Sequence, residues 1–141
     1  MSAITGRVLV TGAGGQLGGV IAAEYAGHAD VMALRHSDLD ITSADAVQRA
    51  VSSFRPTHII NCASYNLVDR AEDEPEAALN VNAFGVRVLA RAAATRGAIL
   101  VHYSTDFVFD GAGTRPYTGQ DAPNPASVYA ASKLTGEWFA L

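Results

Sequence analysis

The sequence predicts an α/β fold of three layers, in which helices cover both faces of a doubly wound parallel sheet. Short apolar runs alternate along the chain with longer stretches of helical periodicity, which is the pattern of a parallel sheet. A glycine-rich turn follows the first apolar run, and turn-forming residues separate the later segments. At 141 residues the chain can form one domain with a packed core. We therefore expect residues 1–141 to fold as a single domain.

Four segments are expected to form strands, because each is short and rich in apolar and β-branched residues. These segments are residues 7–11, 30–35, 57–61 and 98–103. We expect the sheet order 3-2-1-4, with the strands numbered along the chain, as in classical doubly wound sheets.

The segments between the strands are expected to form helices, at residues 16–25, 43–54, 75–96 and 127–141. Ser43 suits an N-cap position, and Pro75 suits a first helical turn. Gly97 is placed to end the long third helix. Residues 110–126 are rich in Gly, Pro, Asp and Asn and predict a loop.

Composition excludes several classes of partner. The apolar fraction is 49%, the formal net charge is -4 and no basic run occurs, so we expect neither nucleic acid nor a membrane as partner. The first residues lack a long apolar signal region. The single cysteine, Cys62, fits a reducing cytoplasm. Four scattered histidines predict no metal site.

A glycine-rich turn joins the first strand to the first helix. Gly12, Gly15 and Gly18 form a GxxGxxG pattern there. Such a turn reverses the chain tightly, lets the backbone approach a pyrophosphate, and packs the helix closely against the sheet. The helix N-terminus then presents free N–H groups to the phosphates. The pattern favours a Rossmann-type dinucleotide site, although a purely structural turn has the same composition.

The end of the second strand indicates which cofactor would bind. Arg35 lies where an arginine can hold the 2′-phosphate of NADPH and where an acidic residue would bind the ribose of NADH. A solvated surface arginine is an equal alternative, so NADH stays possible. Asp40 could accept a hydrogen bond from the adenine amino group, with Ile41 packed against the adenine ring. Alternatively, Asp40 could be an ordinary turn aspartate.

Tyr129 and Lys133 are four residues apart on a predicted helix and therefore share one face. An ammonium beside a phenol stabilises the phenolate and makes the hydroxyl a usable acid. Ser104 and Thr105 follow the fourth strand, at the sheet edge where ligands bind, and a hydroxyl there could hold a substrate carbonyl. Each pair alone also has a purely structural interpretation. Tyr129 and Lys133 could lie on a solvated helix face, and Ser104 and Thr105 could cap the local backbone.

Six segments together resemble the dTDP-4-dehydrorhamnose reductase family of extended short-chain dehydrogenases and reductases. They span almost the whole chain in the family's order, and the STDFVFDG stretch is the most specific part. The segments are VTGAGGQLG (10–18), DLDIT (38–42), NCASYNLVDRAE (61–72), VNAFG (81–85), HYSTDFVFDG (102–111) and VYAASKLTGE (128–137).

The resemblance implies reduction of the 4-keto group of a nucleotide-linked 6-deoxy sugar by NADPH or NADH. It makes Tyr129 the general acid, and Lys133 the partner that activates Tyr129 and binds the nicotinamide ribose. Thr105 would orient the carbonyl oxygen, with Asp106 beside the sugar. The cofactor-binding residues would be Gly12, Gly15, Gln16, Leu17, Arg35, Asp40, Ile41, Ser64, Tyr65, Asn66, Tyr103, Tyr129 and Lys133.

A few positions depart from the family pattern. Cys62, Asn66 and Ala130 stand where alanine, threonine and glycine are usual, and Gly119 replaces a frequent glutamate. The sequence also stops at Leu141, so we expect a fragment truncated after about four strands, without the sugar-binding lobe. Such a chain is expected to bind cofactor weakly if at all, to lack catalysis, and to form homo-oligomers through its exposed sheet edge. Apolar surface is expected from Val128, Leu134, Trp138 and Phe139.

Two other functions remain open at this point. The beta subunit of methionine adenosyltransferase has similar motifs yet serves a partner enzyme, which would make this chain a regulatory subunit. A nucleotide-sugar epimerase or dehydratase that retains its NAD is the third possibility.

Overall fold

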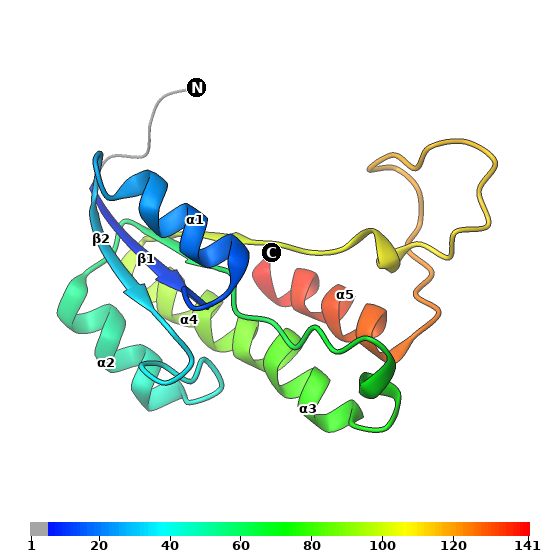
Figure 1. Cartoon of the computed structure of the whole chain (residues 1–141), viewed down its shortest axis with the longest axis horizontal. Helices are drawn as coiled ribbons and strands as arrows, with labels where there is room; N and C mark the ends of the chain where they lie inside the picture. Colours follow the sequence, from blue (N-terminus) through cyan, green and yellow to red (C-terminus); the bar gives the residue numbers. More distant parts are fainter. Residues whose placement is uncertain (1–5) are drawn as a thin grey trace.

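The computed structural model describes residues 6–141 and shows a four-stranded parallel sheet with helices on both faces (Figure 1). The expectation about a signal region concerns residues that lie mostly outside this range. The described part contains no helix long and apolar enough to cross a membrane. The strands are β1 (Arg7–Thr11), β2 (Asp30–Leu34), β3 (His58–Asn61) and β4 (Ile99–His102).

The helices lie close to the predicted segments, within one or two residues at each end. The long predicted helix over 75–96 is helical throughout, but a π-helical turn interrupts it. The helical elements are α1 (Gln16–Tyr25), α2 (Ala44–Phe54), η1 (Asp69–Glu72), α3 (Pro75–Leu79), the π-helical η2 (Asn80–Gly85), α4 (Val86–Arg96), η3 (Asp106–Val108) and α5 (Val128–Ala140).

The strand order is β2-β1-β3-β4, so the expected order 3-2-1-4 was wrong. β3 pairs with β1 on the side opposite β2, with Val10 level with both Ala33 and Ile60. β3 lies inside the sheet rather than at its edge because both of its faces are buried. Ile59 and Ile60 point to opposite faces and are 0% and 3% exposed, which requires a central strand. β2 is only partly buried and suits the edge.

Each face of the sheet has its own core. On one face, Val8, Val10 and Ile60 pack beneath α1. On the other face, α2 and α4 cover Leu9 and Ile59. Figure 1 shows α1 on one side of the sheet, with α2 and α4 on the other. The three-layer α/β fold is therefore confirmed.

The predicted helix ends are confirmed by their capping geometry. The Ser43 hydroxyl accepts from the Ala46 N–H, and Pro75 is in the first turn of α3. Gly97 ends α4 with a φ of 64°, a left-handed conformation that glycine adopts without strain. Ser127 caps α5 by accepting from the Ala130 N–H.

Helix α5 lies beside α4 and against the π-helical turn η2 (Figure 1). The contact is very close, since a Cβ atom on Gly136 would lie 2.1 Å from the carbonyl oxygen of Asn82. On α5, Leu134 is buried, contrary to the expected exposure, whereas Trp138 is 63% exposed as expected.

Candidate functional site

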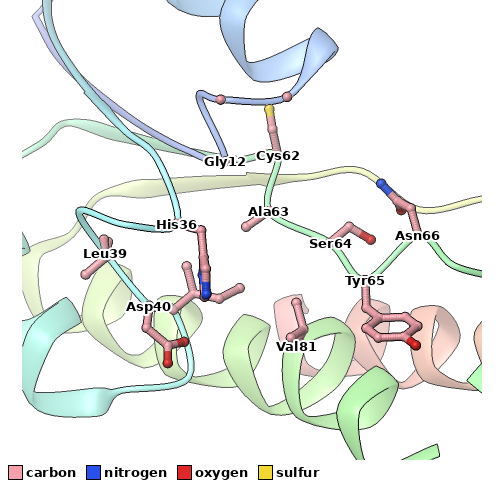
Figure 2. Close-up of a pocket in the computed structure, with 13 residues that line it drawn as sticks. Gly12, His36, Leu39, Asp40, Cys62, Ala63, Ser64, Tyr65, Asn66 and Val81 are labelled. Atoms are coloured by element: carbon pink, nitrogen blue, oxygen red, sulfur yellow. The ribbon is translucent and has the colours of Figure 1, made fainter. Parts of the chain in front are cut away.

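The carboxyl ends of the four parallel strands meet at one edge of the sheet, where their loops enclose two adjoining clefts. The β2 cleft, of about 400 Å³, lies between the glycine-rich turn and the segment after β2 (Figure 2). The α5 cleft, of about 450 Å³, lies between the start of α1 and α5. The clefts share the residues Gly15, Cys62, Ala63, Ser64 and Asn66. They therefore form one extended groove.

The glycine-rich turn is built by close backbone approaches. Gly12 has a φ of 68°, and a Cβ atom there would lie 2.5 Å from the backbone nitrogen of Ala63. A Cβ atom on Gly18 would lie 2.4 Å from the carbonyl oxygen of Gly12. Only glycine fits either position, and the start of α1 is thereby packed tightly against the ends of β1 and β3.

The N-terminus of α1 faces the α5 cleft. Its N-cap is Gly15, no side chain caps it, and its first turn holds no acidic residue. Gln16 and Leu17 line the cleft beside it. Uncapped backbone N–H groups and the positive end of the helix dipole favour an anionic group here, such as a pyrophosphate.

Tyr129 and Lys133 both line the α5 cleft from the same face of α5. Lys133 is 4% exposed, and its Nζ donates to the carbonyl oxygen of Tyr103 at 2.6 Å. Burial lowers the pKa of Lys133, and the nearby Glu137 carboxylate partly opposes that shift. The Tyr129 ring packs edge-on against Phe107, with ring centroids 6.2 Å apart. The predicted Tyr/Lys pair thus lies opposite the N-terminus of α1.

A buried asparagine that sequence reasoning missed connects the two sides of the groove. Asn82, in η2, is 1% exposed. Its Oδ1 accepts from the Ser64 hydroxyl at 2.9 Å and from the Tyr65 N–H at 2.8 Å. Its Nδ2 donates to the Tyr65 carbonyl oxygen at 3.0 Å and to the Ser132 hydroxyl at 2.9 Å.

Ser132 extends this network to the Tyr/Lys helix. Its hydroxyl donates to the carbonyl oxygen of Tyr129 at 2.7 Å. All the donors and acceptors of the Asn82 amide are therefore used to join the loop after β3 to α5. An asparagine in the middle of a helical segment is intrinsically unfavourable, and this was the available sequence signal.

A second polar chain crosses the ends of three strands. The Thr11 hydroxyl donates to Asn61 Oδ1 at 2.6 Å, and Asn61 Nδ2 lies 3.1 Å from His102 Nδ1. Burial lowers the pKa of His102 to about 4, and the Lys133 charge adds to the shift. His102 is therefore neutral at physiological pH. Its buried Nε2 has no hydrogen-bond partner among residues 6–141.

Most residues predicted for the site line the groove. Those in the β2 cleft are Gly12, Gly15, Asp40, Ile41, Ser64, Tyr65 and Asn66. Those in the α5 cleft are Gln16, Leu17, Tyr103, Tyr129 and Lys133. The structure thus brings together residues from four separate loops and from the two helices α1 and α5.

Three predicted residues lie outside both linings, namely Arg35, Thr105 and Asp106. The stem of Arg35 runs alongside Gly14, where a Cβ atom would lie 3.5 Å from Arg35 Cγ. Thr105 caps η3, and its hydroxyl accepts from the Phe107 N–H at 3.2 Å. His36 lines the β2 cleft although sequence reasoning did not select it.

Ser104 lines the α5 cleft beside Tyr103. Its hydroxyl donates to the Glu137 carboxylate, one turn beyond Lys133 on α5. Two successive residues after β4 are thus bonded to two successive turns of α5.

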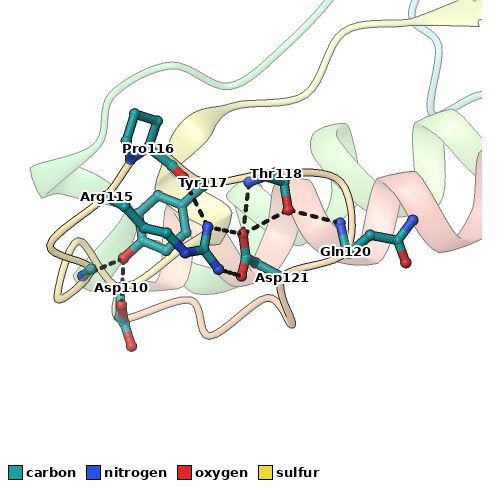
Figure 3. A network of polar contacts seen from close by, with 8 residues as sticks. Asp110, Arg115, Pro116, Tyr117, Thr118, Gln120 and Asp121 are labelled. Carbon is teal, nitrogen blue, oxygen red and sulfur yellow. Dashed lines mark hydrogen bonds and ion pairs between the residues drawn. The ribbon is translucent and has the colours of Figure 1, made fainter.

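The predicted loop over 110–126 is exposed but internally ordered (Figure 3). The Asp110 carboxylate accepts from Asn124 Nδ2 at 2.9 Å and from the Tyr117 hydroxyl at 2.8 Å. The Asp121 carboxylate pairs with the Arg115 guanidinium at 3.0 and 2.5 Å. These bonds lower the pKa of each carboxyl group to about 2.

The groove suits a dinucleotide in its chemistry. An uncapped helix N-terminus at its middle suits a pyrophosphate, and the β2 cleft offers Asp40 and the apolar Leu39 and Ile41. The α5 cleft offers Tyr129 and a buried cation. Residues 6–141 hold no cluster of His, Cys, Asp and Glu side chains suited to a metal ion.

Known proteins match this chain over nearly its full length. A reductase of Mycolicibacterium smegmatis, named dTDP-4-dehydrorhamnose reductase, is 48% identical over 139 residues, which are 96% of this chain and 41% of that protein. The reductase of the same name from Aggregatibacter actinomycetemcomitans is 46% identical over 137 residues, which are 96% of this chain and 47% of that protein.

A solved structure agrees with the fold. The crystal structure of dTDP-4-dehydrorhamnose reductase from Bacillus anthracis in complex with NADP superposes with a TM-score of 0.93 at 41% identity. The match covers 99% of this chain and 50% of that one.

The similarity to known proteins is limited to part of their length, and a family model matches nearly all of this chain. This chain spans about half the length of the relatives it matches, 47% and 41% for the two curated reductases. The family model described as the RmlD substrate binding domain matches residues 6–141. The resemblance expected from the sequence is thus confirmed, and the chain belongs to the RmlD substrate binding domain family.

Proposed function

We propose that this chain is the cofactor-binding part of an NADPH-dependent oxidoreductase that reduces the 4-keto group of a dTDP-4-dehydro-6-deoxy sugar, in dTDP-rhamnose biosynthesis. The observation that carries the proposal is the α5 cleft, where Tyr129 and Lys133 lie opposite the uncapped start of α1. The names of the reductases that it resembles support the choice of reaction.

The groove would bind the cofactor along its length. Asp40 and Ile41 in the β2 cleft would hold the adenosine end, and the backbone N–H groups of Gln16 and Leu17 would bind the pyrophosphate. Ser64, Tyr65 and Asn66 would continue toward the α5 cleft. NADPH is the cofactor we propose, with NADH possible, since the similar reductase of Bacillus anthracis was solved with NADP.

Two residues of α5 would supply the proton that the reduction needs. NADPH, when bound, supplies the hydride for the carbonyl carbon. The hydroxyl of Tyr129 would donate its proton to the oxygen of the reduced carbonyl. Lys133 carries three N–H donors, of which one is bonded to the Tyr103 carbonyl oxygen, so two remain for the Tyr129 oxygen and a ribose hydroxyl.

Thr105 and Asp106 would face the sugar at the entrance of the α5 cleft. Thr105 is the N-cap of η3, Asp106 is its first residue, and the next residue, Phe107, packs against the Tyr129 ring. We propose that Thr105 orients the carbonyl oxygen and that Asp106 lies beside the sugar ring, as the family resemblance implies. The protein would work in the cytoplasm, as the single free thiol, Cys62, also suggests.

A net reduction distinguishes this proposal from the alternatives. An epimerase regenerates its cofactor in each turnover, and a regulatory subunit would consume none. The matched relatives described above are named as reductases, which favours net consumption of NADPH.

The first test measures cofactor binding to the 141-residue chain by fluorescence titration with NADPH. Gln16→Glu places a carboxylate at the start of α1 without changing the size of the side chain, and we expect NADPH affinity to fall at least about tenfold. Gln48→Glu, on the exposed face of α2, makes the same charge change and should leave binding unaltered. Equal affinities in the two variants would contradict a pyrophosphate site at α1.

The second test measures activity after fusion of this chain to the carboxyl-terminal half of the Mycolicibacterium smegmatis reductase. The fusion should oxidise NADPH only when a dTDP-4-dehydro-6-deoxy sugar is present. A fusion that folds and binds NADPH yet leaves it unoxidised would exclude the proposed reaction. Turnover without net loss of NADPH would instead identify an epimerase.

A further inference from the structure

The segment that leaves β4 is held against α5 by two side chains from successive turns of that helix. The Nζ of Lys133 donates to the carbonyl oxygen of Tyr103 at 2.6 Å. The hydroxyl of the next residue, Ser104, donates to the carboxylate of Glu137, which lies one turn after Lys133 on α5. Residues spaced in this way share one helix face, so both bonds lie along one side of α5. Two adjacent anchors prevent the segment from pivoting about either one.

This double anchor fixes where the next residue lies. Thr105 follows Ser104 directly and is the N-cap of η3, where its hydroxyl accepts from the Phe107 N–H at 3.2 Å. Phe107 packs edge-on against the ring of Tyr129. Thr105 therefore lies between two contacts with α5, one through Glu137 and one through Tyr129. The separation between the hydroxyl proposed to orient the carbonyl and the proposed acid depends on both contacts.

Lys133 also needs a negative charge near it, because its side chain is only 4% exposed. Burial lowers the pKa of Lys133, and the charge of the Glu137 carboxylate opposes that shift. The described lining of the α5 cleft contains no aspartate or glutamate side chain. The counter-charge therefore comes from the next turn of the same helix. An anion inside the cleft would repel the cofactor phosphates, and this placement avoids that repulsion.

We infer that Glu137 is a positioning residue of the proposed active site, whose carboxylate both holds Ser104 against α5 and serves as the counter-charge of Lys133. The inference rests on the proposed function, which gives Lys133 and Thr105 their roles. Glu137 acts on Thr105 through the chain and on Lys133 through its charge. Its loss should therefore impair both the orientation of the carbonyl and the activation of Tyr129.

Other ionisable groups near Lys133 carry no charge at physiological pH. On β4, burial lowers the pKa of His102 to about 4. Burial raises the pKa of the Tyr103 hydroxyl, which follows it in the chain. In the loop after β3, burial also raises the pKa of the Cys62 thiol. All three groups are neutral, so they do not replace Glu137 as a counter-charge.

The charged groups on the elements that pack against α5 lie elsewhere. The Glu72 carboxylate, from η1, accepts from the backbone N–H of the first residue of α5 at 2.8 Å. The Arg87 guanidinium, from α4, lies over an aromatic ring near the end of α5, 5.6 Å from its centroid. Glu76 on α3 and Asp106 in η3 are exposed. None of these four groups belongs to the described lining of the α5 cleft.

The charge is tested on the 141-residue chain, in which Lys133 is the only lysine. Isotope labelling of lysine therefore gives one side-chain NMR signal, whose titration midpoint is that of Lys133. Glu137→Gln keeps the size of the side chain and an accepting oxygen, and it removes the charge. We expect the acid dissociation constant of Lys133 to rise about two- to fivefold, the range of exposed charge pairs. Glu24→Gln, on the exposed end of α1, makes the same change and should leave the midpoint unaltered.

The hydrogen bond is tested in the fusion with the carboxyl-terminal half of the Mycolicibacterium smegmatis reductase. Ser104→Ala removes the donor and keeps the charges of Glu137 and Lys133. We expect kcat to fall about tenfold or more while the Kd for NADPH hardly changes, because Thr105 is no longer held in place. Ser104→Thr keeps a hydroxyl and should restore most of the lost turnover. In Glu137→Gln, the alkaline limb of the kcat profile should move to lower pH together with the Lys133 midpoint.

Equal Lys133 midpoints in the native chain and in Glu137→Gln would overturn this inference, and so would a native kcat in the Ser104→Ala fusion. Either result would leave the proposed function intact, since the native fusion would still consume NADPH. A native fusion that binds NADPH and leaves it unoxidised would instead overturn the proposed function, on which the inference rests.

Discussion

At the scale of single residues, Lys133 shows how the fold prepares a side chain for chemistry. Its ammonium is nearly buried, which lowers its pKa because the charged form is desolvated. The Tyr103 carbonyl oxygen and the Glu137 carboxylate compensate part of that cost. The neutral His102 nearby adds no opposing charge at physiological pH. Lys133 is therefore a fixed cation directed into the α5 cleft.

Tyr129→Phe tests the proposed proton donor in the fused, active protein. The variant removes the hydroxyl and keeps the ring that packs against Phe107. We expect turnover to fall by about 10² or more with NADPH affinity nearly unchanged. Steady-state kinetics and a binding titration measure the two effects separately. Near-normal turnover would show that another group delivers the proton.

Alkylation of Cys62 offers a direct measure of whether cofactor occupies the groove. Cys62 is the only cysteine of the sequence and lines both clefts. Burial raises the pKa of its thiol, so alkylation should be slow and should accelerate with rising pH. NADPH at about ten times its Kd should slow alkylation about tenfold, since only the free form reacts. Mass spectrometry of iodoacetamide-treated protein measures the rate, and Cys62→Ser gives the blank. Unchanged alkylation at saturating NADPH would place the cofactor elsewhere.

At the scale of elements, the seating of α5 on the π-helical turn η2 positions the site. The π turn directs Asn82 inward, where its amide joins the loop after β3 to Ser132 on α5. Gly136 permits α5 to approach the same turn by backbone contact. π-helical turns occur frequently at functional sites, and here the turn connects the proposed cofactor loop with the Tyr/Lys helix.

Gly136→Ala tests this seating. The added methyl group would lie 2.1 Å from the Asn82 carbonyl oxygen, and a backbone atom cannot move aside easily. We expect a loss of about 1–3 kcal/mol in the free energy of unfolding, typical of overpacking. Urea denaturation followed by circular dichroism measures it. Gly27→Ala is the control, since nothing lies within 4 Å of its added methyl group. Equal stabilities for the two variants would contradict the close contact.

The loop over 110–126 gives a prediction of pH dependence. The Asp110 and Asp121 carboxyls have pKa values of about 2, below the usual value of an aspartate. Because the pKa of each carboxyl group is lower in the folded state, its ionised form stabilises the ordered loop. That stabilisation is fully present above about pH 4 and is lost as the pH falls through about 2. Carboxyl carbon NMR titration measures both midpoints.

Two variants separate the halves of this network. Arg115→Gln should raise the midpoint of Asp121 alone, because the guanidinium bonds that carboxylate. Tyr117→Phe should raise the midpoint of Asp110 alone and keep the stacking on Phe109. A shift of both midpoints in either variant would show that the loop unfolds as a unit.

At the scale of the whole molecule, the sheet has an open edge. β4 pairs with β3 on one side, and no strand among residues 6–141 pairs with its other side. Ile99 on β4 is 57% exposed, and Trp138 on α5 is 63% exposed. A groove of about 590 Å³ lies between α4 and α5, and its lining includes Trp138 and Leu100 together with two arginines. Unpaired strand edges with apolar neighbours favour association with another chain.

We therefore predict that the 141-residue chain self-associates through the β4 edge. Ile99→Lys should reduce association, because a lysine on an edge strand opposes pairing with a second strand. Analytical ultracentrifugation over a range of concentrations measures the effect. Val20→Lys on α1, where Val20 is 68% exposed, makes the same charge change away from the edge and should not alter association. A native chain that stays monomeric at high concentration would contradict this prediction.

The sequence by itself determined the local structure and the family. Strand and helix segments, the caps at Ser43 and Gly97, and the glycine-rich turn depend on residues close in the chain, whose periodicity and backbone preferences act locally. Motif order was sufficient to indicate the family, because the six segments occur in the family's order over almost the whole chain. The set of residues lining the groove followed largely from the same resemblance.

Only the tertiary structure decided the strand order and the partners across the groove. Burial on both faces of β3 placed it next to β1, which no local pattern specified. The π turn brought Asn82 to α5, and the course of the chain after β2 put His36 rather than Arg35 in the cleft lining. These features depend on contacts between residues far apart in the chain, whose energies are settled when the helices pack on the sheet, and a local sequence pattern does not record them.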